Sequence, residues 1–446
     1  MGRRPDGGRG HPQGGEAVAK TVERLTTAGE TILILAGKGH NGDDVRAAKK
    51  FIQKRRVELL EVFSPDLALP ELNTALKKNP ALVVDGLFGI GLNRELSGAW
   101  KHFIAAVNDS KISVLAVDVP SGLNADTGGN FGAAIRAALT LTVGAPKIGM
   151  LAAEAVPFVG RLEVADDVGL IACPHTAELN WLVPDDFKKF PPPRQVAANK
   201  GDFGHLAVIA GSKGFHGAAV LGARGAQRAQ PGLVTVFARE EIYVPVARQL
   251  QAAMVHAWTN KIVLPKKTSA ILIGPGLAAK EVFSAAKKFT QKIWREAKVP
   301  VVVDASALDF LAAEKFPADA VRVLTPHPGE AARWLGTTAQ RVQSNRVASL
   351  RALSKKFDGC WVILKGHQTL IGRNVGKIFV NSSGNPQLAQ GGSGDLLAGF
   401  LAGLLAQPAL QNDLEKTINY AVWQHGAAAD ELSAVRKIGR LKIWPA

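Results

Sequence analysis

The stretch AQGGSGDLLAGFLAGLL, residues 389–405, places glycines and a serine directly before Asp395 and then continues as a strongly apolar helix. Two interpretations of this arrangement stay open. In one, Asp395 or Ser393 caps the helix and the glycines only turn the chain. In the other, Gly391 to Gly394 leave bare backbone N–H groups at the positive end of a helix, where an anion binds, and Asp395 acts as a base beside that anion.

A glycine-rich pattern follows the first apolar segment of the chain. In TILILAGKGHNGDD, three glycines spaced as GxGxxG occupy positions 37, 39 and 42, and a helix and a second strand carrying Glu61 follow. In dinucleotide-binding proteins such glycines form the turn around the pyrophosphate, and an acidic residue further on binds the ribose. A dehydrogenase is therefore one hypothesis for the first half of the chain.

Two further strand ends in the first half carry polar side chains that a simple nicotinamide-binding domain does not explain. The stretch VVDGLFGIGL offers Asp85 and a second glycine loop, and VDVPSG offers Asp118 and Ser121. Asn41, Asp85 and Ser121 supply hard oxygen atoms, which suit an alkali cation better than a transition metal. Taken singly, each of these residues is more often a cap or turn residue than a ligand.

The composition is that of a large globular protein. With 446 residues the chain exceeds what one hydrophobic core usually supports, so two or three domains are expected. The 54 basic and 38 acidic residues give a net charge of +16, but the basic residues are scattered and are not interleaved with aromatic residues. This pattern favours phosphorylated small molecules over nucleic acid as partners.

Cysteine content and apolar stretches indicate the compartment. Cys173 and Cys360 are too few for a disulfide framework and lack the spacing of zinc ligands, which favours a reducing environment. The N-terminal stretch has no apolar core of the kind that a secretory signal needs. The longest apolar stretch, Leu396–Ala406, falls short of the roughly 18 residues that suggest a membrane span. A cytoplasmic protein without membrane contact is expected.

Apolar and β-branched segments recur between helical segments, and most of them end in glycine, aspartate or proline. Buried parallel strands that deliver polar loops at their carboxyl ends have this pattern, so the sequence predicts an α/β fold with ligands bound at those ends. The segments are TILILAG (31–37), ALVVDGLFG (81–89), SVLAVDVPSG (113–122), ALTLTVGAPKIG (138–149), HLAVIAGS (205–212), AILIGPG (270–276), VPVVVDA (299–305), VRVLTPHPGE (321–330) and CWVILKG (360–366).

The connection between the two sets of segments predicts a domain boundary. Three consecutive prolines, Pro191–Pro193, stiffen this connection and cannot lie inside a helix or a strand. We place the boundary near residues 175–185, with the proline segment leading into the second domain. The predicted domains are residues 1–178 and 179–446.

The motifs of the first half together resemble the NAD(P)H-hydrate epimerase domain, over about residues 16–172. The matching stretches are GKGHNGDD, VVDGLFGIGL, VDVPSGLNADTG and TLTVGAPKIG. The resemblance implies a Rossmann-like three-layer domain in which Asn41, Asp85 and Ser121 bind K⁺ and Asp118 is the catalytic acid or base. It also implies that the hydrated dinucleotide is bound by His40, Asn41, Gly42, Asp43, Asp44, Gly89, Ile90, Gly91, Leu92, Asn93, Arg94 and Asp118.

The first loop departs from the family pattern, which usually reads Asn-Asn-Gly-Gly-Asp-Gly. Here Asp43 adds a second carboxylate, which repels a phosphate unless a cation or a basic side chain intervenes. Val45 removes the freedom to adopt a positive φ. The helical segment GGEAVAKTVERL is also shorter than the usual family N-terminus. Together these departures predict a weakened epimerase.

The motifs of the second half resemble the ADP- or ATP-dependent NAD(P)H-hydrate dehydratase domain, a member of the ribokinase-like fold, over about residues 180–432. They are NKGDFGHLAVIAGSKGFHGAA, GPGL, VVDASALDFL, TPHPGEAARWL, LKGHQTLI and NSSGNPQLAQGGSGD, without a Walker loop. The resemblance implies that Ala218, Gly276, His327 and Asp395 contact the hydrated dinucleotide, and that the nucleotide is bound by Lys365, Gly366, His367, Gln368, Thr369 and Gly394. His327 either orients the substrate or is structural.

Both resemblances together predict a fused metabolite-repair enzyme acting on NADHX and NADPHX, the C6 hydrates of NADH and NADPH. The first domain is expected to interconvert the two C6 epimers with K⁺. The second is expected to phosphorylate the C6 hydroxyl of the S epimer from ADP or ATP with Mg²⁺, with Asp395 as the base. A homo-oligomer is expected. The alternative is a ribokinase-like small-molecule kinase fused to a non-catalytic dinucleotide-binding module.

Overall fold

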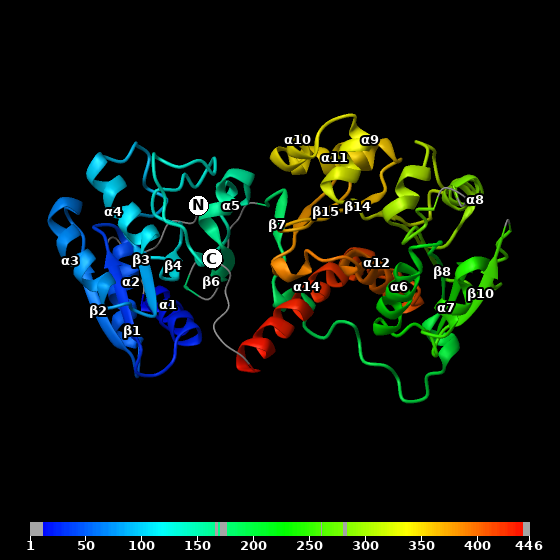
Figure 1. Cartoon of the computed structure of the whole chain (residues 1–446), viewed down its shortest axis with the longest axis horizontal. Coiled ribbons are helices and arrows are strands. Elements are labelled where there is room, and N and C mark those ends of the chain that lie inside the picture. The colour runs from blue at the N-terminus through cyan, green and yellow to red at the C-terminus, as the bar shows by residue number, and fades with distance from the viewer. Residues whose placement is uncertain (1–11, 166–167, 170–175, 260, 280–282, 440–446) are drawn as a thin grey trace. The chain divides into compact units, whose positions relative to one another are not determined.

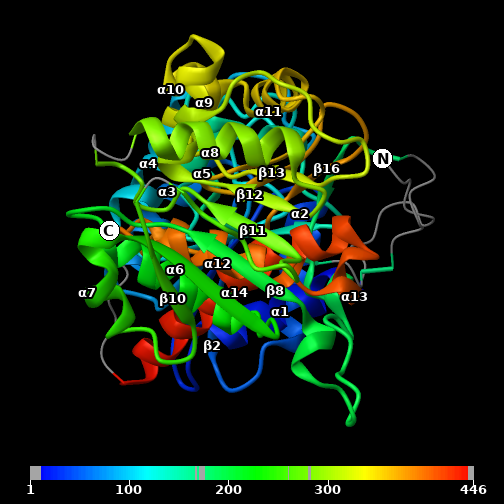
Figure 2. The same cartoon turned by 90° about the vertical axis from the view of Figure 1, so that its right-hand side faces the viewer.

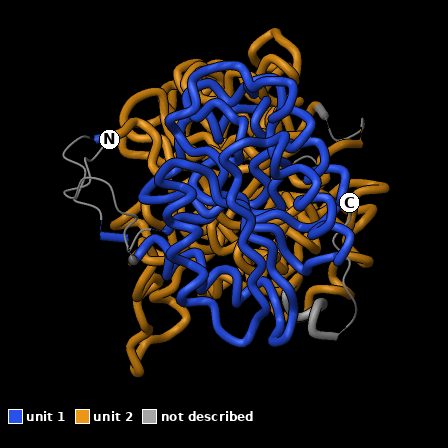
Figure 3. Tube along the Cα trace, turned by 90° about the vertical axis from the view of Figure 1, so that its left-hand side faces the viewer, with its two compact units in different colours: residues 1–176, 444–446 blue, residues 177–443 orange. Residues whose placement is uncertain are grey.

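The computed structural model describes residues 12–165, 168–169, 176–259, 261–279 and 283–439 (Figure 1). The chain forms two compact units that divide between Thr176 and Ala177 (Figure 3). Among the described residues, no helix combines the length and the apolar character that crossing a membrane requires. Cys360 is a buried free thiol, whereas Cys173 lies outside the described residues.

The first unit is built on a six-stranded sheet in which every pairing is parallel. The strands lie in the order β2-β1-β3-β4-β5-β6. Strand β2 lies on one side of β1 and β3 lies on the other, so the strand order reverses between β1 and β3. The strands are β1 (Thr31–Ala36), β2 (Arg56–Glu61), β3 (Leu82–Gly86), β4 (Val114–Val117), β5 (Leu139–Val143) and β6 (Arg161–Ala165).

Helices cover both faces of this sheet. They are α1 (Pro12–Leu25), α2 (His40–Phe51), α3 (Pro65–Lys77), α4 (Gly98–Asp109) and α5 (Val156–Val159). Successive side chains of a strand point to opposite faces. Ile32 and Ile34 of β1 accordingly pack in a core with α1 and α2, whereas Leu33 and Leu35 pack in a second core with α3 and α4. The predicted Rossmann-like three-layer domain is confirmed.

The second unit contains a ten-stranded mixed sheet in the order β10-β9-β8-β11-β12-β13-β14-β15-β16-β7. The strands from β10 to β14 are parallel, whereas β15 runs antiparallel to both of its neighbours. They are β7 (Leu179–Trp181), β8 (His205–Ile209), β9 (Leu233–Arg239), β10 (Met254–Trp258), β11 (Ala270–Ile273), β12 (Val301–Val303), β13 (Arg322–Leu324), β14 (Trp361–Leu364), β15 (Leu370–Gly372) and β16 (Ile378–Val380).

Helices cover the second sheet on both faces, with α6, α12 and α14 on one side and α8 and α11 on the other (Figure 2). The helices are α6 (His216–Arg228), α7 (Tyr243–Ala247), α8 (Phe283–Glu296), α9 (Pro328–Leu335), α10 (Ala339–Ser344), α11 (Arg346–Lys356), α12 (Ser393–Leu405), α13 (Pro408–Gln411) and α14 (Leu414–Gly439). Glycines let α6 and α12 approach closely, because a Cβ added at Gly399 would lie 1.9 Å from the Gly222 carbonyl oxygen. This packing fixes the start of α12.

Candidate active sites

The strand order of the second sheet reverses between β8 and β11, which is where open α/β sheets bind ligands. The loops after these strands are joined, since the Ser212 hydroxyl donates to the Gly276 carbonyl oxygen over 2.7 Å. Gly276 has a φ of +65°, and a Cβ added there would lie 2.8 Å from the Ala218 Cβ. The predicted substrate residues Ala218 and Gly276 therefore lie side by side beyond the carboxyl ends of β8 and β11.

The start of α12 decides between the two interpretations of Asp395. Gly392 occupies the N-cap position with a φ of +90°, and no side chain caps the helix. The interpretation of Asp395 or Ser393 as a cap is therefore wrong. The backbone N–H groups of Gly394 and Asp395 donate to no other described residue, as is usual in the first turn of a helix. These N–H groups stay available to an anion, as the second interpretation requires.

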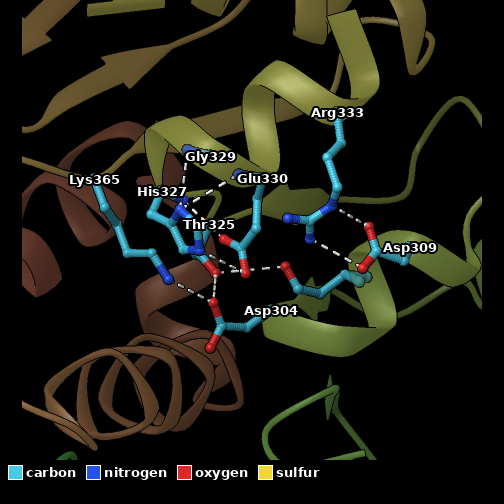
Figure 4. A network of polar contacts seen from close by, with 9 residues as sticks. Asp304, Asp309, Thr325, His327, Gly329, Glu330, Arg333 and Lys365 are labelled. Carbon is cyan, nitrogen blue, oxygen red and sulfur yellow. Dashed lines mark hydrogen bonds and ion pairs between the residues drawn. The ribbon is translucent and has the colours of Figure 1, made fainter. Parts of the chain in front are cut away.

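A buried ion pair lies near the start of this helix, and its residues and a neighbouring threonine follow three adjacent strands (Figure 4). The ammonium of Lys365, after β14, lies 2.9 Å from an oxygen of Asp304, after β12. Thr325, after β13, donates to the same oxygen over 2.6 Å, and Asp304 is only 1% exposed. A Cβ added at Gly394 would lie 3.4 Å from the Lys365 ammonium. Lys365 thus carries a positive charge to the start of α12.

The electrostatic surroundings give Asp395 the properties of a base at neutral pH. Burial raises the pKa of Asp395 to about 6, and the nearby Asp304 adds to the rise while Lys365 opposes it. Burial by itself would lower the pKa of Lys365, but Asp304, Glu330 and Asp395 together raise it. Lys365 therefore stays protonated, and Asp395 is ionised but basic near pH 7, which suits general base catalysis.

His327 has a structural role that the sequence left open. Its Nδ1 accepts hydrogen bonds from the backbone N–H groups of Gly329 and Glu330, over 3.0 and 3.3 Å, at the start of α9 (Figure 4). The Glu330 carboxylate accepts from the His327 backbone N–H over 2.8 Å, which completes a reciprocal cap. The ring is still 54% exposed, so capping leaves it accessible to a substrate.

Five of the six predicted nucleotide residues, Lys365 to Thr369, form the turn between β14 and β15, whereas Gly394 lies in the first turn of α12. Gly366 and Gln368 have φ values of +138° and +51°, and the Thr369 hydroxyl donates to the Gly366 carbonyl oxygen over 3.0 Å. The Lys365 backbone N–H is bound to the Pro326 carbonyl oxygen over 2.9 Å. Residues 365–369 therefore form a tight turn beside the end of β13.

Sequence reasoning gave no role to three residues of this site. Asp304 and Thr325 follow buried strands in quoted motifs, and that position was the available signal. His425 lies on α14, where no motif marks it, and bonds to the backbone of Ser393. Burial and the nearby Lys365 lower the pKa of His425, against the effect of that bond. His425 thus faces the start of α12 as a neutral ring.

In the first unit the structure brings the predicted cation ligands together. The Ser121 hydroxyl donates to one oxygen of Asp85 over 2.6 Å, and the Ser121 N–H donates to the other over 2.9 Å. The Asn41 amide donates to the carbonyl oxygens of Phe88 and Val117 over 2.7 and 2.6 Å. These groups lie at the carboxyl ends of β1, β3 and β4.

The charge of this cluster fits an alkali cation. Asp85 is fully buried, and burial raises its pKa to about 6, against the effect of the hydrogen bonds from Ser121 and Leu87. No basic side chain in the described ranges forms an ion pair with Asp85. The carbonyl oxygens of Phe88 and Val117 already accept from the Asn41 amide, whereas the Asp85 carboxylate has no positive partner among the described residues. A hard cation would supply that charge.

Asp118, the predicted acid or base, has a left-handed backbone conformation and pairs with a lysine. It has a φ of +64°, which is costly for a residue with a Cβ. Its carboxylate pairs with Lys147, and it accepts from the backbone N–H of Val143 over 3.1 Å. Lys147 belongs to the quoted stretch TLTVGAPKIG, yet sequence reasoning gave it no role. The structure thus places Lys147 directly beside the predicted acid or base.

The second glycine loop adjoins the cation cluster at one end. A Cβ added at Gly89 would lie 3.2 Å from the Asn41 side chain. The Leu92 N–H closes a turn back to the Gly89 carbonyl oxygen over 3.2 Å, and Ile90 is 45% exposed. The remaining predicted residues Gly91, Asn93 and Arg94 complete this loop between β3 and α4.

The structure removes two reasons for expecting a weakened epimerase. Residues 40–45 begin helix α2 and do not form a free loop. The Arg46 guanidinium donates to the Asp43 carboxylate over 2.9 Å, so a basic side chain offsets the charge of Asp43. Arg46 also donates to the carboxylate of Glu61. Val45 has no positive φ. His40, Asn41, Gly42 and Asp44 lie in the same first turns of α2.

Val45 is a core residue, which gives the first prediction. It is fully buried, and a Cβ added at Gly86 would lie 2.6 Å from its Cγ2. Val45→Gly is expected to lower the free energy of unfolding by about 2–4 kcal/mol, because it leaves a cavity and puts glycine into a helix. Epimer exchange per folded molecule should not rise. Denaturant titration and an exchange assay measure both, and faster exchange at unchanged stability would contradict this prediction.

Comparison with known proteins identifies the family of the chain. Residues 206–442 match the family described as NAD(P)H-hydrate dehydratase, and residues 43–149 match the YjeF-related protein N-terminus. A bifunctional NAD(P)H-hydrate repair enzyme Nnr from Coxiella burnetii is 33% identical over 93% of this chain and 88% of its own length. The enzyme of that name from Escherichia coli is 32% identical, covering 94% and 84%. This chain belongs to the family of bifunctional NAD(P)H-hydrate repair enzymes.

A solved structure supports the fold of the second unit of this repair enzyme. A ribokinase-like superfamily protein from Enterococcus faecalis is 25% identical, covers 59% of this chain and 92% of its own length, and has a TM-score of 0.50. The predicted ribokinase-like fold is confirmed. The dehydratase and epimerase prediction also holds over the alternative of a kinase fused to a binding module.

Proposed function

We propose that the two units divide the repair of NADHX and NADPHX between them. Residues 1–178 would interconvert the R and S epimers, and residues 179–446 would return the S epimer to NADH or NADPH at the expense of ADP or ATP. The observation that carries this proposal is the basic carboxylate of Asp395 beside Lys365 at the open N-terminus of α12. This arrangement provides a base and an anion site within one turn.

The dehydratase step follows from these groups. Asp395 accepts the proton of the C6 hydroxyl while the hydroxyl oxygen attacks the terminal phosphorus of the nucleotide, and the bond from that phosphorus to its bridging oxygen breaks. The N–H groups of Gly394 and Asp395 and the ammonium of Lys365 stabilise the charge on the transferred phosphoryl group. Phosphate then leaves C6, C5 loses a proton, and the double bond of the dihydronicotinamide returns.

Magnesium would supply further neutralisation of the nucleotide phosphates. The part of the chain that the structure describes contains no group of three or more His, Cys, Asp or Glu side chains that could hold a metal. Mg²⁺ usually keeps several waters and binds largely through phosphates, so this absence fits its role with the nucleotide.

The epimerase step would use the strained carboxylate of the first unit. Asp118 would act as acid or base, and the ammonium of Lys147 would pair with its carboxylate between turnovers. K⁺ would be held by Asn41, Asp85 and Ser121, where it would supply the missing positive charge. His40 to Asp44 and Gly89 to Arg94 would line the hydrate.

The potassium site gives the second prediction. In Tris buffer, replacing sodium with potassium is expected to raise the melting temperature of the wild type, because a cation that binds only the folded state stabilises it. The shift should vanish in Asp85→Asn, which removes the uncompensated carboxylate. Asp109→Asn, a change at an exposed carboxylate of α4, should keep the shift. Equal melting temperatures of the wild type in the two salts would contradict the potassium site.

The activity itself is tested by incubating the full chain with mixed-epimer NADHX and each nucleotide in turn. The proposed function predicts phosphate release and return of absorbance at the reduced-nicotinamide band for both epimers. A kinase would leave a stable phosphorylated hydrate, and a first unit that only binds would leave the R epimer behind. We also propose that the protein is cytoplasmic and that it is a homo-oligomer, and light scattering on the purified protein tests the oligomeric state.

A further inference from the structure

Arg346, the first residue of α11, lies behind the turn formed by residues 365–369. Its guanidinium donates to the carbonyl oxygens of Leu364 over 3.1 Å, of Gln368 over 3.2 Å, and of His367. Burial lowers the pKa of Arg346 to about 10, which leaves it protonated at neutral pH. Within the described ranges no carboxylate forms an ion pair with it. The turn is therefore hydrogen-bonded to the guanidinium of Arg346, whose positive charge no described carboxylate compensates.

In this turn the carbonyl groups accept hydrogen bonds from the protein, whereas the N–H groups of residues 366–369 donate none to the described residues. Three carbonyl oxygens of residues 364–368 are taken up by one guanidinium. The backbone N–H groups of Gly366, His367, Gln368 and Thr369 donate to no other residue in the described part of the chain. Four successive N–H groups without an acceptor, beside a fixed positive charge, form an arrangement that attracts an anion.

The neighbouring side chains do not cancel this charge. Burial and the nearby Arg346 lower the pKa of His367, so its ring is neutral near pH 7. The Nζ of Lys365 points from the same turn toward Asp304 (Figure 4). The Gly366 backbone lies close to Arg346, since an added Cβ would be 3.5 Å from its Nη2. The charge next to the turn is thus that of Arg346.

We propose that Arg346 is a positioning residue for the nucleotide, holding the carbonyl groups of the turn so that the N–H groups of residues 366–369 receive its phosphates. This inference rests on the proposed function, because the ligand it assumes is the ADP or ATP of the dehydratase reaction. Arg346 reaches the nucleotide only through the backbone and takes no part in the proton transfer of Asp395. Its loss therefore weakens nucleotide binding without removing the chemistry.

The test compares Arg346→Met and Arg346→Lys with the wild-type full chain. Arg346→Met is expected to raise the KM and the calorimetric Kd for ADP and ATP by about 10- to 100-fold, as for a lost charged hydrogen-bonding group. The KM for the hydrate and kcat at saturating nucleotide should stay within about twofold. Arg346→Lys keeps the charge but cannot reach all three carbonyl groups, so it should restore part of the affinity.

Arg351 of the same helix offers a matched control. It donates to the carbonyl oxygens of Gly376, over 2.6 Å, and of Arg373, and it pairs with Glu178 over 2.7 Å. Arg351→Met thus removes a comparable set of bonds that does not include the turn at 365–369. It should leave the KM for nucleotide unchanged, whatever it does to stability.

The outcomes separate the inference from the function on which it rests. A nucleotide Kd within twofold of wild type in Arg346→Met overturns the inference, as does an equal loss in Arg351→Met. If Arg346→Met does not fold, the nucleotide Kd of Arg346→Lys is compared with that of the wild type instead, and a smaller rise is expected. Calorimetry needs no turnover, so a wild type that binds ADP or ATP without restoring reduced nicotinamide contradicts the proposed function and leaves the test of Arg346 intact.

Discussion

Asp395→Asn is expected to lower nucleotide-dependent turnover by roughly 10² to 10⁴, the usual loss when a general base is removed. Asparagine keeps the shape of the side chain but cannot accept the proton of the C6 hydroxyl. The fold should survive, because Gly392 and not Asp395 occupies the N-cap of α12. Thermal unfolding, calorimetric nucleotide binding and recovery of reduced nicotinamide, measured on one preparation, separate chemistry from folding and from binding.

The pH dependence of the wild type tests the same assignment. Only the ionised carboxylate is a base, and its pKa is raised to about 6, so kcat/KM should fall as the pH drops through that value. The residual activity of Asp395→Asn should lack this acidic limb. Ser393→Ala, the neighbouring change that tests the other proposed cap, should retain most turnover. Near-normal turnover in Asp395→Asn would contradict its role as the base.

Stability should respond to pH in the direction opposite to activity. A carboxylate whose pKa is higher in the folded state than in the unfolded state destabilises the fold when it is ionised. The wild type should therefore gain stability from this group as the pH falls from above 6 toward 4, and Asp395→Asn should lack that gain. Because Asp395 is only partly buried, the difference at pH 7 should be on the order of 1 kcal/mol in favour of the variant.

The sequence located the strands that carry chemistry better than those that complete the sheets. Each of the nine quoted segments contains an observed strand, because a buried parallel strand is apolar throughout and ends in a polar turn. The segments that were not identified include β10, whose side chains are largely exposed, and β15 and β16, each of three residues. Short or exposed edge strands give too little apolar signal to stand out.

The motifs named candidate site residues, but the interactions between them depend on the order of the strands. Asp304 and Lys365 are 61 positions apart and meet only because β12, β13 and β14 are neighbours. A sequence without homologues gives no such order. The pairing of Asp43 with Arg46, three positions later on α2, is instead local in sequence, and it removes the expected repulsion of a phosphate by Asp43. The residues able to do chemistry were predictable from the sequence, whereas the ion-pair partner of each charged side chain was not.

Lys365→Met is expected to abolish detectable dehydratase activity and to destabilise the second unit by about 3–5 kcal/mol. The stability loss follows because Asp304 is 1% exposed, and removing one partner leaves an uncompensated buried charge. The activity loss follows because the variant carries no ammonium beside Gly394 to meet the phosphoryl group. Denaturant unfolding and the nicotinamide assay measure the two effects separately.

The double variant Asp304→Asn/Lys365→Met distinguishes these two effects. It removes both charges, so it should recover most of the stability that Lys365→Met loses, yet it should stay inactive because the ammonium is still missing. If the double variant regained activity together with stability, Lys365 would be a structural partner of Asp304 and not a part of the phosphoryl-transfer site.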